Sequence, residues 1–130
     1  MEMEQKKLIN DVATFLKEEG FCPSMLTENI IDFKKEGEVY SVKIERDTAP
    51  FFATVFRLTK FGEGINTQKV TRIVDELDGI WCIKASWKDR IFAVKFEMIL
   101  MEIDTFKDAF YTTLKMLDYA MNSFFDKYND

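Results

Sequence analysis

Apolar and polar positions follow two different periods along the chain. In three stretches the apolar residues recur at three- and four-residue steps, which places them on one stripe of a helix. The three stripes are Leu8, Ile9, Val12, Phe15 and Leu16; Val70, Ile73, Val74 and Leu77; and Phe106, Phe110, Leu114, Leu117, Met121 and Phe124. In the blocks between these stretches apolar and polar residues alternate, as they do on a strand with one buried face. The pattern predicts helices over about 4–19, about 67–77 and from about 104 onward, together with five strands, in the order α-β-β-β-α-β-β-α.

The predicted helices are bounded by residues that suit helix ends. Gly20 and Gly79 follow the first two helical patterns, and glycine adopts the left-handed conformation that closes a helix at no steric cost. Asn66 or Thr67 comes before the second pattern, and both residue types are preferred N-caps. The stretch 21–28 is predicted to be a connection between the first helix and the first strand.

The first pair of alternating blocks predicts a β-hairpin. A two-residue turn at Glu36 and Gly37 pairs Phe33 with Tyr40 and collects polar residues on the opposite face. Because one register sorts apolar from polar side chains, the pairing is well supported.

A second hairpin is predicted around Lys88 and Asp89. Its inward residues are expected to be Trp81, Ile83, Ala85, Phe92, Val94 and Phe96. The strand over about 51–59 carries bulky residues on both sides, so the pattern leaves its inward side open.

The apolar face of the sheet is the only predicted surface large enough to cover three helical stripes. We therefore expect an α+β fold in which three helices pack on one face of a five-stranded antiparallel sheet, within a single domain over residues 1–130. The other face is not uniformly polar. The apolar residues expected on it are Ile80, Cys82, Ile91, Ala93, Ile99 and Met101.

Apolar surface of this kind is uncommon on a monomer and indicates self-association or a bound partner. The candidate partner-binding residues are Ile91, Ala93, Ile99 and Met101. We expect an aspartate at Ile99 to disrupt association while the fold survives.

Composition and charge narrow the classes of function. Of the 130 residues 47% are hydrophobic and 15% aromatic, and the net charge is −5. A protein of net negative charge repels a phosphate backbone, so we expect no nucleic-acid partner. The aromatic residues that could stack on bases are expected to be core residues instead; they are Tyr40, Phe51, Phe52, Trp81 and Trp87. The absence of a long apolar run predicts no membrane association, and Cys22 and Cys82 are expected to be buried, reduced thiols of a cytoplasmic protein.

The candidate chemistry points away from catalysis. The chain contains no histidine, which removes the commonest general base and the commonest metal ligand. The glycines in 62–64 lack both the third glycine of a dinucleotide fingerprint and the Gly-Lys-Ser/Thr of a P-loop. The neighbouring acids at 18–19 and at 75–76, together with Asp78, are expected on solvated helix faces. We therefore expect no enzymatic activity, no metal and no cofactor.

The order of elements, the F-x-x-x-G-x-x-Y run from Phe33 to Tyr40, the second hairpin and the long C-terminal helix resemble the type III secretion chaperone-like fold. Within this fold the chain is similar to the YbjN-like family. The resemblance implies a protein-binding domain that is often dimeric and is not an enzyme. Secretion chaperones bind an extended segment of a client along apolar grooves and strand edges, and no residue motif defines that site.

Taken together, these features predict a cytoplasmic protein-interaction domain that forms a homodimer. We expect an apolar groove or sheet edge to bind a peptide segment of a partner protein. The alternative is a small-molecule-binding module, with a cavity lined by Phe and Met between the helices and the sheet.

Overall fold

The computed structural model describes residues 3–130, and within them the fold is α+β, with three α-helices and an antiparallel sheet. Along the chain the elements are α1 (Met3–Glu18), β1 (Ser24–Thr27), β2 (Ile30–Lys35), β3 (Glu38–Glu45), β4 (Phe51–Lys60), α2 (Thr67–Leu77), the short 3₁₀ helix η1 (Ile80–Cys82), β5 (Lys84–Lys88), β6 (Ile91–Leu100) and α3 (Ile103–Tyr128). The strands follow one another in the sheet as β1-β2-β3-β4-β6-β5.

Two compact units divide the chain. Unit 1 contains the residues up to Val55 together with Glu97–Tyr111, and unit 2 contains Phe56–Phe96 together with Thr112–Asp130. Strands β4 and β6 and helix α3 each contribute residues to both units. Each unit is described by itself below.

The sheet has six strands, so the prediction of five is wrong. The additional strand, β1, lies in the stretch that was expected to be a connection. All four of its side chains are exposed, so no alternation of buried and exposed positions marks it in the sequence. Its backbone pairs with β2, with Ser24 opposite Asp32 and Met25 opposite Ile31. Pairing of the backbone, and not burial of side chains, makes this segment a strand.

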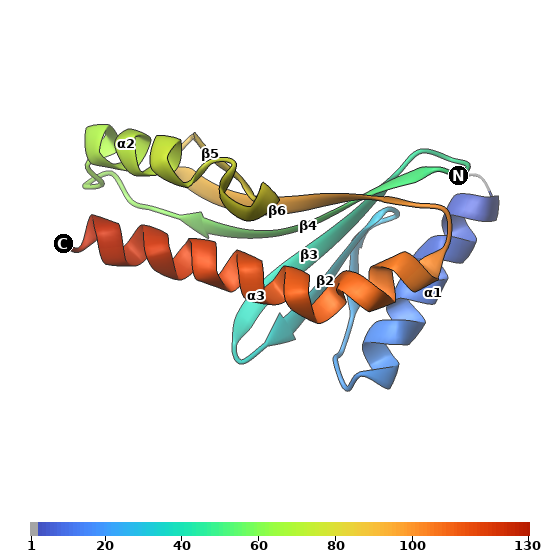
Figure 1. The fold of residues 1–130 in the computed structure, drawn as a ribbon. Coiled ribbons are helices and arrows are strands. Elements are labelled where there is room, and N and C mark those ends of the chain that lie inside the picture. The colour runs from blue at the N-terminus through green and yellow to red at the C-terminus, as the bar shows by residue number, and fades with distance from the viewer. Residues whose placement is uncertain (1–2) are drawn as a thin grey trace. The chain divides into compact units, whose positions relative to one another are not determined.

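The hairpin of β2 and β3 has the predicted register. Figure 1 shows β2 and β3 side by side, joined by a short turn. Phe33 lies opposite Tyr40 and Lys35 opposite Glu38. The two turn residues, at 36 and 37, have φ angles of 54° and 82°, the pair of left-handed conformations that a type I′ turn requires. On the polar face of the hairpin, the Ser41 hydroxyl donates a hydrogen bond of 2.7 Å to the Asp32 carboxylate.

Helix α1 packs on β3 and buries the stripe that the sequence predicts, which consists of Leu8, Ile9, Val12, Phe15 and Leu16. The helix ends as predicted at Gly20, whose φ is 93°. The Phe21 amide donates to the Leu16 carbonyl at 2.9 Å and the Gly20 amide donates to the Lys17 carbonyl at 3.0 Å. These two bonds form a Schellman motif and bring Phe21 back onto the helix.

The inward side of β4, which the sequence left open, is the side that carries Phe51, Ala53 and Val55. The next inward residue is Arg57, which is buried together with the apolar residues of its face. On the opposite side Phe52 and Leu58 are exposed by 44% and 55%. Aromatic residues on both sides, with an arginine on the inward one, explain why hydrophobic alternation could not orient this strand.

In unit 2, helix α2 begins and ends where the pattern predicts. The Asn66 side chain accepts a hydrogen bond of 3.0 Å from the Lys69 amide and so acts as the N-cap. The buried residues are the predicted stripe of Val70, Ile73, Val74 and Leu77, and the helix packs on β5.

The second hairpin, between β5 and β6, turns one residue later than predicted. Asp89 and Arg90 occupy the turn with φ angles of 53° and 63°, so Ala85 lies opposite Val94 and Trp87 opposite Phe92. The shift moves each pairing by two positions and therefore leaves the inward face unchanged.

The predicted strand residues 80–82 instead form η1. Trp81 and Cys82 have φ angles of 51° and 64°, and Trp81 is 53% exposed, so the prediction that it faces inward is wrong. The Gly79 amide donates to the Ile83 carbonyl and the Ile83 amide donates to the Ile80 carbonyl, at 2.8 and 3.0 Å. These local bonds replace the strand pairing that alternation implied.

Helix α3 buries its whole predicted stripe of Phe106, Phe110, Leu114, Leu117, Met121 and Phe124. In unit 1, Phe110 meets Phe15 edge to face at 5.1 Å between ring centroids, and Phe33 stacks on Tyr40 at 5.4 Å. In unit 2, Phe92 stacks on Phe124 at 4.0 Å. Among the described helices, none has the length and apolar character that a membrane span requires.

Candidate protein-interaction site

The four candidate partner-binding residues fall into two groups. Ile91 and Ala93 are half-buried residues of β6 in unit 2, whereas Ile99 on β6 and Met101 just beyond its end belong to unit 1 and are exposed by 64% and 65%. Along β6 the buried residues are Phe92, Val94, Met98 and Leu100. The side chains at 91, 93 and 99 alternate with them and therefore lie on the other side of the strand, as predicted.

Ile99 lines a surface groove in unit 1. The groove has a volume of about 460 Å³ and is lined by Phe52, Glu97, Met98 and Ile99. The Arg46 guanidinium lies over the Phe52 ring at 5.7 Å from its centroid, a cation–π arrangement. The groove thus has an apolar floor with charged groups beside it.

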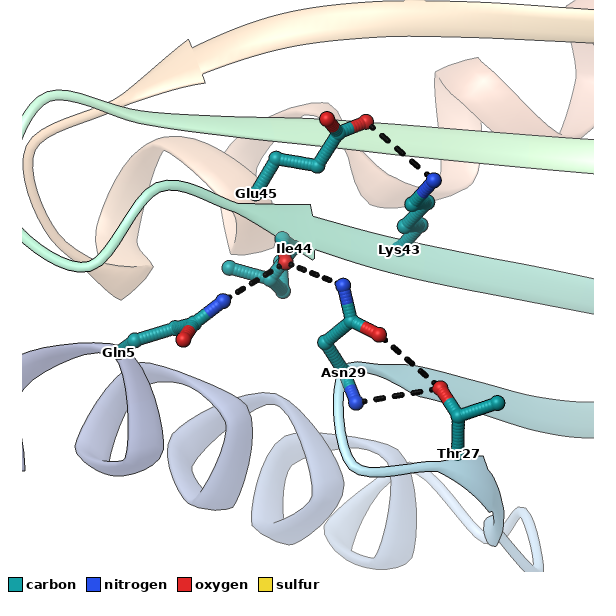
Figure 2. A network of polar contacts seen from close by, with 6 residues as sticks. All are labelled: Gln5, Thr27, Asn29, Lys43, Ile44 and Glu45. Carbon is teal, nitrogen blue, oxygen red and sulfur yellow. Dashed lines mark hydrogen bonds and ion pairs between the residues drawn. The ribbon is translucent and has the colours of Figure 1, made fainter. Parts of the chain in front are cut away.

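Charged residues of both signs accompany this groove on the same side of the sheet. On β3, Lys43 and Glu45 alternate with the buried residues Val42 and Ile44, and their side chains form an ion pair of 3.7 Å (Figure 2). An exposed pair of this kind adds little to stability, so its main effect is on what the surface can bind.

Met101 lines a different groove of unit 1, of about 260 Å³. It shares this groove with Glu4, Lys7, Leu8, Asp11, Ala49, Phe51, Glu102 and Ile103. Lys7 and Asp11 form an i,i+4 ion pair of 3.0 Å there. The polar lining makes this groove less suited to an apolar partner than the groove at Ile99.

An apolar edge that sequence reasoning missed lies at β1, the first strand of the sheet order. Met25 and Leu26 are exposed by 51% and 63%, and none of the four residues of β1 is charged. A groove of about 380 Å³ adjoins this strand and is lined mainly by apolar surface. Its lining residues are Gly20, Phe21, Cys22, Ser24, Asp32, Phe33, Lys34 and Val39.

A polar network holds the end of β1 in place (Figure 2). The Thr27 hydroxyl bonds with the Asn29 side chain at 3.0 Å and accepts from the Asn29 amide at 3.3 Å. The Asn29 side-chain amide and the buried Gln5 side chain both donate to the Ile44 carbonyl, at 3.2 and 3.0 Å. The network therefore connects α1, the turn after β1 and the end of β3.

The strand at the other edge of the sheet, β5, differs in chemistry from β1. It begins with Lys84 and ends with Lys88, both of which are exposed. Lysines on an edge strand disfavour pairing with another strand, because pairing would bury or crowd their charges. The uncharged edge is thus the one at β1.

Unit 2 displays an exposed aromatic pair. Trp81 and Tyr119 lie with ring centroids 4.5 Å apart and are exposed by 53% and 51%. The left-handed backbone at Trp81 holds its ring there, outside the core in which the sequence placed it. The prediction that the aromatic residues are core residues is therefore wrong for Trp81 and for Phe52.

Three of the neighbouring acidic residues have partners within the fold. Glu19 accepts a hydrogen bond of 2.6 Å from the Tyr111 hydroxyl, Glu76 pairs with Lys127 at 3.2 Å, and Asp78 accepts from the Ala85 amide at 3.0 Å. The hydrogen bond from Tyr111 to Glu19, followed by burial, raises the pKa of the tyrosine above its ordinary value. Within residues 3–130, no group of three or more acidic or cysteine side chains is arranged to hold a metal ion.

The two cysteines are free thiols, and both are exposed, so the expectation that they are buried is wrong. Cys22 lies in the link between α1 and β1, and Cys82 lies in η1.

Comparison with protein-family models finds no match for this chain, and no curated protein matches it.

Proposed function

We propose that this chain is a non-enzymatic protein-interaction domain that forms a homodimer and binds an extended peptide segment of a partner protein in the cytoplasm. The role is that of the YbjN-like and secretion chaperone-like proteins, which the element order predicted from the sequence resembles. The observation that carries the proposal is the exposure of large apolar side chains along the sheet of unit 1, at Met25, Leu26, Phe52 and Ile99.

Burial of these side chains gives the driving force for binding. Removing apolar surface from water contributes about 25 cal/mol per Å², so each large aliphatic or aromatic side chain that a partner covers contributes about 1–2 kcal/mol. A few such side chains, gathered beside grooves, are what a protein-binding surface needs.

The edge strand β1 is the best site for the peptide segment. A free strand edge offers backbone donors and acceptors to an extended chain, and the adjoining groove of about 380 Å³ offers space for one of its side chains. The absence of charge on Ser24–Thr27 leaves this edge open to apolar sequences.

The packing of the aromatic residues supports an interaction domain over a small-molecule module. Phe92 and Phe124 are in stacking contact at 4.0 Å, and Phe61 lies 5.7 Å from Phe124. A ligand cavity lined by phenylalanines between helix and sheet would require these rings to be apart.

Affinity capture from the native cell tests the proposal, with the wild-type chain and two single variants as baits. Leu26→Asp introduces a charge on the edge strand, and Leu58→Asp introduces one at a similarly exposed position, 55% against 63%, on β4 in unit 2. We expect the wild type and Leu58→Asp to retain a defined protein and Leu26→Asp to lose it. Binding of that protein, once purified, should weaken about tenfold or more on Leu26→Asp in a direct titration.

The proposal fails if the wild-type chain captures no protein above an empty matrix. If Leu26→Asp and the wild type retain the captured protein equally, the peptide site does not lie at β1. Turnover of a small molecule by the purified chain would contradict the non-enzymatic assignment.

A further inference from the structure

The surface of unit 1 that contains the groove at Ile99 indicates where two copies of the chain meet. This inference rests on the homodimer of the proposed function. We propose that a second copy of this chain docks face to face on this surface, with Ile99 of each copy in the groove of the other. We call this surface of the sheet the outward face of unit 1. Its residues on neighbouring strands β3, β4 and β6 are Lys43, Glu45, Phe52, Thr54, Glu97 and Ile99. Arg46, which follows β3 and lies over the Phe52 ring, also belongs to it.

The outward face contains both a protruding side chain and a hollow. Ile99 is 64% exposed, and it stands at a groove of about 460 Å³ that Phe52 also lines. A two-fold axis brings the same patch of two subunits together, so each copy can offer a knob and receive one. A surface with only a knob or only a hollow would need a different partner.

The charges of the outward face suit a second copy. Lys43 and Arg46 are positive and Glu45 and Glu97 are negative, so the charges around the groove balance, whereas the whole chain carries −5. Two chains of net charge −5 repel each other on average, and a balanced face is where they can meet without like-charge repulsion. A two-fold axis can also bring the positive side chains around the groove of one copy opposite the negative side chains of the other.

Size also favours a second copy over a short peptide at this face. A stable protein interface buries about 800 Å² on each partner, so a face spread over three strands suits a second copy better than a single short strand edge does. Two sheets pack face to face about 10 Å apart with their side chains interleaved, which is the spacing at which Ile99 would reach the opposite groove. The four-residue edge at β1 offers much less area, which suits it to a peptide.

Cysteine cross-linking tests the placement of the second copy. In a chain in which both exposed cysteines are replaced (Cys22→Ser and Cys82→Ser), a single cysteine is introduced by Ile99→Cys or, as the matched control, by Leu26→Cys. The two positions are exposed by 64% and 63% in the single chain, so their thiols should react equally with a monofunctional maleimide at protein concentrations low enough to keep the chain monomeric. With a short bismaleimide at tens of micromolar protein, we expect Ile99→Cys to give a covalent dimer and Leu26→Cys to give none.

Sedimentation velocity separates failure of this inference from failure of the proposed function. We expect the wild type to be a dimer at tens of micromolar, Ile99→Asp to dissociate about tenfold or more readily, and Leu26→Asp to remain a dimer. A dimeric wild type that Ile99→Asp leaves unchanged, or cross-linking through Leu26→Cys alone, overturns the inference and leaves the homodimer standing. A monomeric wild type would contradict the homodimer of the proposed function as well.

A structural role of Ile99 is distinguished by a further variant. Far-ultraviolet circular dichroism of Ile99→Asp should match the wild type, because the side chain is largely exposed in the single chain. If that variant does not fold, Phe52→Ser provides the same test from the adjacent strand, and a dimer that persists in folded Phe52→Ser overturns the inference.

Discussion

At the scale of single residues, the least expected feature is the buried arginine of β4. The Arg57 guanidinium donates a hydrogen bond of 2.9 Å to the Asp118 carboxylate of α3, and its side chain is only 10% exposed. Burial of a cation is costly unless an anion and hydrogen bonds compensate it, so Asp118 is needed where an apolar residue would otherwise fit. The ion pair with Asp118 compensates an arginine on a strand face whose other buried side chains are apolar.

Loss of the Asp118 carboxylate should therefore destabilise unit 2. We expect Asp118→Ala to lower the free energy of unfolding by about 2 kcal/mol, because it leaves the Arg57 charge buried with weaker compensation. The measurement is urea denaturation. The control is the double variant Arg57→Met with Asp118→Leu, which should recover much of the loss; a double variant as unstable as Asp118→Ala would contradict this account.

The hydrogen bond from Tyr111 to Glu19 makes a pH-dependent contribution within unit 1. Because it raises the pKa of Tyr111 in the folded chain above the ordinary value of 10.0, the folded state holds the phenol proton more tightly than the unfolded state does. The contribution is complete below pH 10 and is lost as the pH rises through the folded pKa. We expect the difference in unfolding free energy between the wild type and Tyr111→Phe to decrease above pH 10. A difference that stays constant from pH 7 to 11 would show that this hydrogen bond makes no pH-dependent contribution to the free energy of unfolding.

At the scale of elements, local signals placed the helices and tight turns, and pairing across the sheet decided the rest. Helix α2 lies between a capping asparagine and a glycine, and the turn between β2 and β3 needs two left-handed residues, both of which are local requirements. Strand β1 has no buried residue, so only its partner β2 defines it. The replacement of a strand by η1 likewise depends on local backbone bonds that alternation does not reveal.

The N-cap of α2 provides a test at this scale. Asn66→Ala removes the acceptor for the Lys69 amide and should lower the free energy of unfolding by about 1 kcal/mol. Asn66→Asp keeps an acceptor at the same place and should be close to the wild type. Thermal or urea unfolding measures both variants, and an alanine variant as stable as the aspartate variant would rule out a capping role.

At the scale of the whole molecule, three elements run through both units. Since β4, β6 and α3 each contribute residues to both, we expect the chain to unfold as the single domain that the sequence predicts. Both tryptophans, Trp81 and Trp87, lie in unit 2, whereas far-ultraviolet circular dichroism reports on both units. The urea midpoints from tryptophan fluorescence and circular dichroism should coincide, and separated midpoints would show that the units unfold independently.

The candidate site was only partly accessible from the sequence, for a physical reason. The alternation along β6 sufficed to place Ile91, Ala93 and Ile99 on one side of their strand, because side chains alternate whatever the partner strand is. It could not show that Phe52 and Ile99 share a groove, because that depends on which strands are neighbours.

The sequence by itself determined the α+β class, the three helices with their buried stripes and the register of the first hairpin, because short-range periodicity and turn chemistry act between residues close along the chain. The tertiary structure alone decided the sixth strand, the inward side of β4 and the lining of each groove. These features depend on backbone pairing and burial between segments distant in sequence, and such interactions leave no periodic trace in either segment alone.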